Sequence, residues 1–233
     1  MSTDKNTQAE LAEAARHMRH RINTKHMLNG VRMIDPSTAY IDDTVEIEAG
    51  VVIYPNVILE GNCKISAGAY IGANSHLKNA NIGAGAEIQQ SVIMNSTVGA
   101  GTTVGPFAYL REDAQIGEAC RIGNFVEIKK SNIGDGTKAA HLAYIGDADV
   151  GKNVNYSCGA ITANYDGEKK HRTVIGDDAF IGSNSNLIAP VKIGEGALVA
   201  AGSTITDDLQ SGSLGIARAR QVEKLGRAKT KKS

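Results

Sequence analysis

Along most of the chain, an isoleucine or valine followed by glycine recurs every five or six residues. The pair occurs a dozen times between Ile71-Gly72 and Ile193-Gly194, and many of the positions in between hold Ala, Ser, Thr, Asn or Gly. A six-residue apolar period matches neither the 3.6-residue period of an amphipathic helix nor the two-residue period of an alternating strand. It indicates a short strand followed by a corner, repeated many times.

Three such units close a triangular coil of about 18 residues, and successive coils stack about 4.8 Å apart through parallel sheet pairing. The inward isoleucine or valine fills the interior, and the following glycine allows the corner. The pattern therefore predicts an all-β protein, a left-handed parallel β-helix of hexapeptide repeats, over residues 25–206.

Both ends of the chain depart from this pattern. The segment "NTQAELAEAARHMRHRIN" has helical periodicity, and Thr7 with Glu10 forms the signature of a capping box, so residues 1–24 are predicted to be a helical arm. His17 and His20 are expected to be solvated on this helix. After Ile205 the repeats stop, and residues 207–233 are predicted to be an irregular, basic C-terminal tail.

Composition narrows the classes of partner. Lys plus Arg and Asp plus Glu number 25 each, so neither nucleic acid nor an anionic membrane is expected as the main partner. The three cysteines show no paired or metal-type spacing, which fits a reducing cytosol. No apolar run approaches the roughly 18 residues of a membrane span, and the polar N-terminus has no signal-peptide core. We expect a cytoplasmic protein.

The repeat pattern is interrupted between Tyr156 and Ile175. "SCGAITANYDGEKKHRTV" replaces about one coil, and Asp166-Gly167 marks a turn within it. Two interpretations remain open, a tolerated surface loop and a loop that leaves the coil to build a site.

The repeat also fixes side-chain direction. Leu110 and Ile128 are inward residues eighteen positions apart, so Arg111 and Lys129, which follow them, are expected to stack at one corner roughly 5 Å apart. Two cations at that distance repel each other unless an anion lies between them. They are either an anion site or two solvated surface charges.

Other polar residues are predicted to share a face with this corner. Glu127 and Tyr144 each precede an inward residue and lie on one face of neighbouring coils. His141, two residues after the inward Ala139, is expected at the corner where that face begins, pointing outward. Such a face could hold a small molecule with an amine at one end and a phosphate at the other, although a lone histidine can also be merely exposed.

A zinc site, as in carbonic anhydrases with this architecture, is the competing interpretation of the histidines. It would require His76, His141 and His171 to converge, and their spacing does not bring them together. No metal is therefore expected.

Three motifs, "NFVE-KK", "K-A-HL-YIGD" and "ANYDG--K", closely resemble the acetyltransferase domain of GlmU. GlmU is the bifunctional enzyme that acetylates glucosamine 1-phosphate and then uridylylates the product on the way to UDP-N-acetylglucosamine and the cell wall. The resemblance runs from about Asn23 to the basic tail, and the N-terminal helix is similar to the arm that joins the two domains of that enzyme. The Gly-rich nucleotide loop of the uridylyltransferase is absent from the sequence, so only the acetyl transfer is expected, whether the chain is a fragment or a naturally short form.

The resemblance implies roles for individual residues. His141 would be the general base, and acetyl-CoA the co-substrate, with no metal required. The enzyme would be a homotrimer with its sites between subunits, acting on a small amino-sugar phosphate. Substrate-binding residues would be Arg111, Lys129, Tyr144, Asn155, Lys170, Glu127 and Asn164. Residues near acetyl-CoA would be Cys158, where the family is expected to have alanine, with Ser183, Ala201, Arg218, Asn164 and Tyr165.

The chemistry of these residue types is compatible with acetyl transfer. A neutral imidazole, with a reference pKa near 6.5, can take a proton from an amine at neutral pH, and the thiolate of CoA is a good leaving group. Two other functions stay open. One is an acyltransferase acting on a different amine or hydroxyl, and the other is a non-enzymatic trimeric scaffold.

Overall fold

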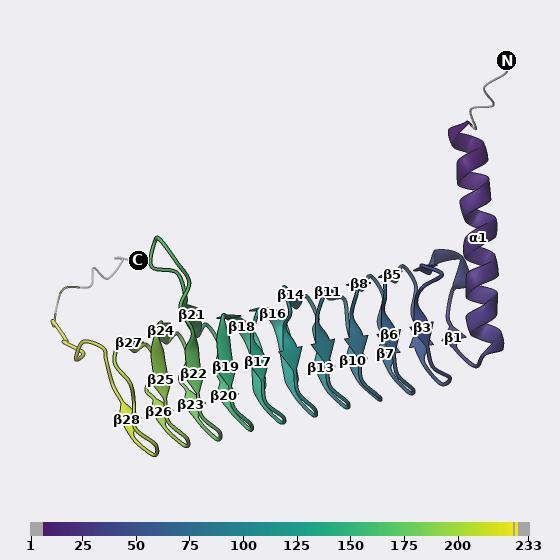
Figure 1. Cartoon of the computed structure of the whole chain (residues 1–233). Helices are drawn as coiled ribbons and strands as arrows, with labels where there is room; N and C mark the ends of the chain where they lie inside the picture. The colour runs from purple at the N-terminus through teal and green to yellow at the C-terminus, as the bar shows by residue number, and fades with distance from the viewer. Residues whose placement is uncertain (1–6, 226, 228–233) are drawn as a thin grey trace, which may run out of the picture.

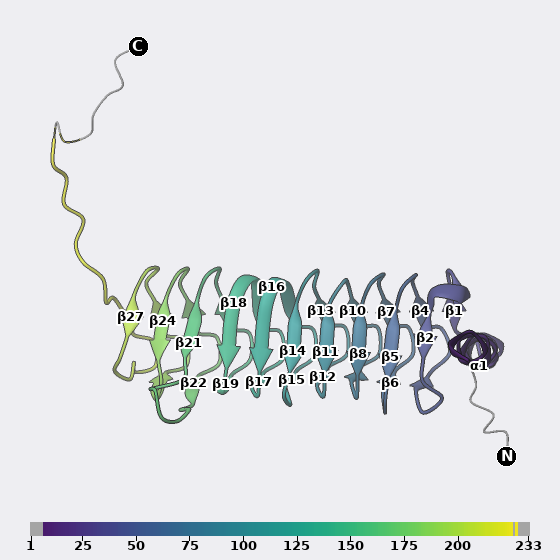
Figure 2. The same ribbon diagram turned by 90° about the horizontal axis from the view of Figure 1, so that it is seen from above.

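The structure is a computed structural model that describes residues 7–225 and 227. It is a solenoid of stacked coils with a single long helix at its N-terminal end (Figure 1). Seen from above, the coils lie side by side and α1 is viewed end-on beside the first of them (Figure 2). All strand pairings between coils are parallel, which confirms the predicted β-helix of hexapeptide repeats.

The solenoid has three flat faces, each built from one strand per coil. The first face contains β1 (Arg32–Met33), β4 (Val52–Ile53), β7 (Tyr70–Ile71), β10 (Glu87–Ile88), β13 (Thr103–Val104), β20 (Asn155–Tyr156), β23 (Phe180–Ile181), β26 (Leu198–Val199) and β28 (Leu214–Gly215). The second contains β2 (Tyr40–Ile41), β5 (Ile58–Glu60), β8 (His76–Lys78), β11 (Val92–Met94), β14 (Tyr109–Arg111), β21 (Ile161–Ala163), β24 (Asn186–Ile188) and β27 (Thr204–Ile205). The third contains β3 (Glu46–Ile47), β6 (Lys64–Ile65), β9 (Asn81–Ile82), β12 (Thr97–Val98), β15 (Gln115–Ile116), β17 (Asn132–Ile133), β19 (Ala148–Val150), β22 (Thr173–Ile175) and β25 (Val191–Ile193).

Two strands break the rule of one short strand per face. β16 (Arg121–Lys129) and β18 (Lys138–Gly146) each run through the corner between the first and second faces. They join these faces into one 19-stranded sheet, while the third face is a separate 9-stranded sheet. This continuous corner is the most unusual part of the solenoid, and it carries His141.

The core consists of the inward residues of the repeat. Isoleucine, valine, leucine and alanine from every coil are buried, among them Leu110 and Ile128, which confirms their predicted inward direction. Tyr156 is the largest fully buried side chain. A triangular interior of this width is filled by one aliphatic side chain per face, which explains how the chain folds with 4% aromatic residues.

Close approach between coils explains the glycine that follows many inward residues. A Cβ added to Gly99 would lie 2.4 Å from the carbonyl oxygen of Gly117 in the next coil, and one added to Gly123 would lie 1.7 Å from that of Ala140. These glycines therefore serve contact between stacked backbones, and any larger residue would force the coils apart.

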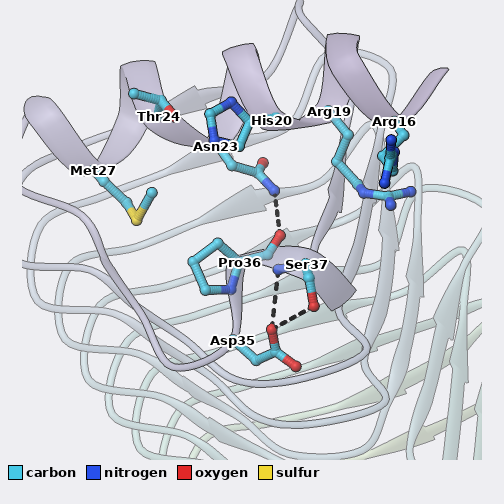
Figure 3. A pocket seen from close by; sticks show the side chains of 9 residues that line it. All are labelled: Arg16, Arg19, His20, Asn23, Thr24, Met27, Asp35, Pro36 and Ser37. Carbon is cyan, nitrogen blue, oxygen red and sulfur yellow. Dashed lines mark hydrogen bonds between the residues drawn. The ribbon is translucent and has the colours of Figure 1, made fainter. Parts of the chain in front are cut away.

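Helix α1 (Gln8–Leu28) begins with the predicted capping box, since Thr7 and Glu10 bond each other's backbone N–H reciprocally. Its C-terminal half touches the solenoid, where the Arg19 guanidinium lies over the ring of Tyr40 and Asn23 donates to the carbonyl oxygens of Pro36 and Ala39, at 2.8 and 2.9 Å. Pro36 begins the short 3-10 helix η1 (Pro36–Thr38). A hollow of about 450 Å³ lies between α1 and this connection (Figure 3).

The element boundaries extend past those expected from the sequence. The helix ends at Leu28, beyond residue 24. The coil continues past residue 206, because β28 pairs with β26 and Leu209 bridges to Ile193. The first residues of the arm and the last ones of the tail lie outside the described residues, and the division into three domains stays a prediction.

The interrupted repeat forms a loop that leaves the solenoid between β21 and β22 (Figure 1). Register partners Val150 and Ile175 are 25 positions apart, whereas Ile133 and Val150 are 17 apart. The extra residues form a short antiparallel bridge between Tyr165 and Lys170. The backbone N–H groups of Lys169 and Glu168 donate to the Asp166 carboxylate at the loop's tip. These two bonds, together with the contact to His171, hold the pKa of that carboxyl far below its usual range.

Candidate functional site

His141 lies on the continuous corner formed by β16 and β18. Its register partner is Asn124, and the two side chains meet with Nδ1 of His141 2.7 Å from Oδ1 of Asn124. An amide oxygen only accepts, so Nδ1 of the ring carries the hydrogen, and in the neutral ring the lone pair lies on Nε2. The imidazole is exposed, as predicted, and Nε2 points its lone pair away from the bond that orients the ring.

The same corner continues through the following coils. Strand pairing aligns four residues of successive coils: Lys138, Asn155, Phe180 and Leu198. The residue three positions after each of them lies at the corner. We call this set the base corner, and its members are Asn124, His141, Cys158, Ser183 and Ala201. His141 and three of the residues expected near acetyl-CoA therefore form one row along the solenoid axis.

The part of this row that follows His141 has polar groups available for a ligand. Cys158 uses its carbonyl oxygen to accept from Asn184, but among the described residues no acceptor is found for its backbone N–H. Arg218, in the irregular segment after β28, donates to the carbonyl oxygen of Ala201 at 3.0 Å. Arg218 is thus placed at the end of the base corner, although it is distant from the repeats in sequence.

A second cluster, the cation corner, lies at the other edge of the second face. Arg111 and Lys129 are register partners, which confirms the predicted stacking. Arg111 donates from Nε to Glu127 at 2.8 Å, and its guanidinium also contacts Glu112. The Nζ atom of Lys129 lies 3.1 Å from Glu112, and Lys129 is only 6% exposed.

The projecting loop adds a third cation to this corner. The side chains of Lys129 and Lys170 are in contact. Hydrogen bonding from Lys170, with the Glu112 pair, raises the pKa of Lys129, whereas the contact with Lys129 and burial lower the pKa of Lys170. At the base of the loop, Asn164 donates to Asp147 at 2.5 Å and lies 3.4 Å from the hydroxyl of Tyr144. Of the two interpretations of the interrupted repeat, the structure therefore supports a loop that contributes to a site.

Glu127 and Tyr144 occupy the strip between the two corners. They are register partners on β16 and β18, as predicted. The five residue steps from Asn124 to Lys129 cover at most about 16 Å of backbone at the usual strand rise, because the chain bends at Phe125. His141 lies at one end of this strip and the cation corner at the other.

Two predicted residues are not brought into these clusters within one chain. Asn155 lies on the first face, and its amide donates to Ser157. Tyr165 is exposed on the loop and donates to the carbonyl oxygen of Gly167. In the described part of the chain, no side-chain hydrogen bond joins either residue to another predicted site residue, and Tyr165 meets Lys170 only through their backbone bridge.

Three residues of the site were not predicted. Asn124 could have been found from its spacing, since it precedes His141 by the same seventeen residues that separate Glu127 from Tyr144. Glu112 directly follows Arg111, and Asp147 follows Gly146, the register partner of Lys129, but their contacts depend on side-chain conformations that spacing does not specify.

The histidines of the solenoid have separate partners. His76 contacts Glu60, His171 contacts Asp166 and His141 contacts Asn124. Across residues 7–225 and 227, no three His, Cys, Asp or Glu side chains lie close enough together to hold a metal ion. All three cysteines are free, and Cys158 is the exposed one. No helix of the described chain is long and apolar enough to cross a membrane.

Comparison with known proteins agrees with the architecture. A family model described as "Bacterial transferase hexapeptide (six repeats)" matches residues 95–130 and 172–207. Among solved structures, the UDP-N-acetylglucosamine acyltransferase of Francisella novicida superimposes with a TM-score of 0.51 at 18% identity, covering 76% of this chain and 62% of that one. That likeness shows the shared fold.

Sequence relatives are much closer. The protein named bifunctional protein GlmU from Clostridium botulinum strain Langeland is 52% identical over 221 residues, which cover 95% of this chain and 48% of that protein. The protein of the same name from Geobacillus sp. strain WCH70 is 55% identical over 219 residues, which cover 94% of this chain and 48% of it. The chain thus spans about half the length of the curated relatives it matches.

Proposed function

We propose that this chain, which corresponds to the acetyltransferase domain of GlmU proteins, transfers the acetyl group of acetyl-CoA to the 2-amine of glucosamine 1-phosphate. One observation carries the proposal. Asn124 orients the His141 imidazole and leaves its Nε2 free, and His141 lies in one row with residues expected near acetyl-CoA. A strip about as wide as one sugar phosphate separates His141 from the three cations Arg111, Lys129 and Lys170. The product is the precursor that uridylylation would convert to UDP-N-acetylglucosamine for cell-wall synthesis.

The reaction follows from these positions. Nε2 of His141 takes a proton from the attacking amine as its nitrogen forms a bond to the thioester carbonyl carbon. The carbon–sulfur bond then breaks, and CoA leaves as a thiolate that receives the proton from His141. The free backbone N–H of Cys158, one coil beyond His141, is placed to donate to the carbonyl oxygen as negative charge develops on it.

The co-substrate would lie along the base corner. The steps from His141 to Cys158, Ser183 and Ala201 cover about 14 Å at the usual spacing of stacked strands. That length suits an extended pantetheine arm, with its thioester beside His141. Arg218 at the far end supplies a cation for the phosphates of CoA. The proposal needs no metal, and the free cysteines suit a cytoplasmic location.

An assay of thiol release tests the proposed reaction. The purified chain, given acetyl-CoA and glucosamine 1-phosphate, is expected to release one free CoA thiol for each N-acetylglucosamine 1-phosphate formed. A reaction without amino sugar corrects for the exposed Cys158. Thiol release no faster with glucosamine 1-phosphate than without it would contradict the proposal, and release with a different amine would favour the other acyltransferase function.

We also propose that the active form is a homotrimer with sites between subunits. Phe107, Phe125 and Leu142 form an exposed apolar row beside the base corner, and all three have positive φ. An L-residue with a side chain pays about 1 kcal/mol or more for that conformation. The equivalent position holds asparagine or glycine in other coils, for example Asn184 and Gly202. Strained, exposed aromatic residues are stabilised if a second copy of the chain covers them.

Light scattering tests the assembly and the role of this row. The wild-type chain is expected to have a mass about three times its 24.5 kDa at micromolar concentration. Phe125→Asn puts the residue used by other coils at this position, so the coil should fold while the trimer weakens. Leu28→Asn removes another exposed apolar side chain, at the end of α1, and should leave the mass unchanged. A wild-type monomer, or a Phe125→Asn trimer as stable as wild type, would argue against this surface.

A further inference from the structure

The carboxylate of Glu112 occupies the space between the cations of the cation corner. One oxygen contacts the Arg111 guanidinium, and the other lies 3.1 Å from Nζ of Lys129. A carboxylate that bridges an arginine fork and a lysine ammonium has the geometry in which these groups bind one phosphate. Glu112 thus makes the contacts that an incoming phosphate would need.

The backbone and the exposure of Glu112 show that this arrangement is local and reversible. Glu112 and Asp113 both have positive φ, at 49° and 66°, in the turn between β14 and β15. The Glu112 side chain is 54% exposed, whereas Lys129 is buried. Rotation of the glutamate side chain into solvent therefore needs no movement of the solenoid, and it leaves Arg111 still held by Glu127.

We propose that Glu112 is a resident counter-anion of the phosphate site, which the substrate phosphate must displace, and that it sets the affinity and selectivity of this site for phosphorylated amino sugars. The inference rests on the proposed function for the identity of the substrate. The competition itself needs only an anion that binds between Arg111 and Lys129.

The local charges explain why displacement is required. Arg111, Lys129 and Lys170 face Glu112, Glu127 and Asp147, so the corner is close to neutral without substrate. Hydrogen bonding from Lys129 lowers the pKa of Glu112, so its carboxylate is ionised at neutral pH. A phosphate dianion cannot share the same two cations with an ionised carboxylate without strong repulsion.

Glu112→Gln tests the competition, and Asp113→Asn is its matched control. Both changes remove one negative charge from the same turn at a residue with positive φ, but Asp113 contacts Gln115 and not the cations. Inorganic phosphate binding by calorimetry and initial rates with glucosamine 1-phosphate and plain glucosamine are measured for each variant. The full chain is used throughout.

Glu112→Gln is expected to tighten inorganic phosphate binding and to lower the KM for glucosamine 1-phosphate by about three- to fivefold, the range of an exposed ion pair. The KM for plain glucosamine and the kcat should stay near wild type, and Asp113→Asn should change none of these values. Added salt should reduce the difference between Glu112→Gln and wild type.

Two outcomes separate this inference from the proposed function. Tighter phosphate binding by Glu112→Gln in a chain that shows no acetyl transfer would support the counter-anion and overturn the function. Normal acetyl transfer with unchanged or weaker phosphate binding in Glu112→Gln would overturn the counter-anion, because the glutamate would then only order the corner.

Discussion

Replacing His141 with alanine is expected to lower the kcat of acetyl transfer by about 100-fold or more, the usual effect of removing a general base. The amine would then lose its proton acceptor while the acetyl-CoA row and the cation corner remain. The side chain is exposed and lies outside the core, so the coil should stay folded. Steady-state rates and the light-scattering mass, measured on the same preparation, check both statements.

His141→Asn and His76→Ala distinguish a base from a structural contact. An asparagine at 141 can still donate to Asn124 from the position of Nδ1 but has no group equivalent to Nε2, so its kcat should fall as far as that of His141→Ala. His76 contacts Glu60 on an earlier coil, and its replacement should leave kcat unchanged. A folded His141→Asn trimer with wild-type turnover would show that the ring serves only to orient its neighbours.

The regular part of the site could be predicted because the repeat converts sequence distance into position. Each residue of a coil has a fixed direction, so spacings of seventeen and eighteen were enough to pair Glu127 with Tyr144 and Arg111 with Lys129. Those spacings depend only on backbone sheet pairing, which is strongly specified when one side of every strand is buried. The same reasoning placed His141 on an outward corner.

The irregular part could not be predicted from periodicity. The loop between β21 and β22 has no repeat, so only its folded path shows that Lys170 reaches Lys129 and that Asn164 reaches Tyr144. The contacts of Glu112 depend on the conformation of its side chain in a turn with positive φ, and the sequence repeat does not specify that conformation. The coil beyond Ile205 was missed because its last strand lacks the isoleucine or valine that marks most of the others, and holds Leu214 and Gly215 instead.

A trimer would also explain why some predicted residues are far from the others in one chain. Asn155 lies on the first face and the cation corner at the far edge of the second, with the base corner between them. Coils of a rigid solenoid cannot fold over to bring these faces together. If both bind one substrate, as proposed, two subunits must meet at the base corner, where the strained Phe125 and Leu142 are exposed.

Replacing Lys129 with alanine should weaken the binding of glucosamine 1-phosphate by about ten- to a hundredfold, the range for losing a charge-assisted hydrogen bond. Lys129 is buried and held by Glu112 and Lys170, so its ammonium is already positioned for an anion. The loss should appear as a raised KM for the phosphorylated sugar. It should be much smaller for plain glucosamine, and the KM for acetyl-CoA should change little because the base corner is separate.

Lys130→Ala is the matched control for this change. Lys130 is the same residue type at the next position, but it is exposed and lies past the end of β16. Replacing Lys130 removes the same unit of positive charge. An effect that both variants share therefore comes from the overall electrostatic field of the protein and not from a contact with the phosphate. If Lys129→Ala raises the KM of both amino sugars equally, or only as much as Lys130→Ala does, the cation corner is not the phosphate site, and the substrate must bind on another face of the solenoid.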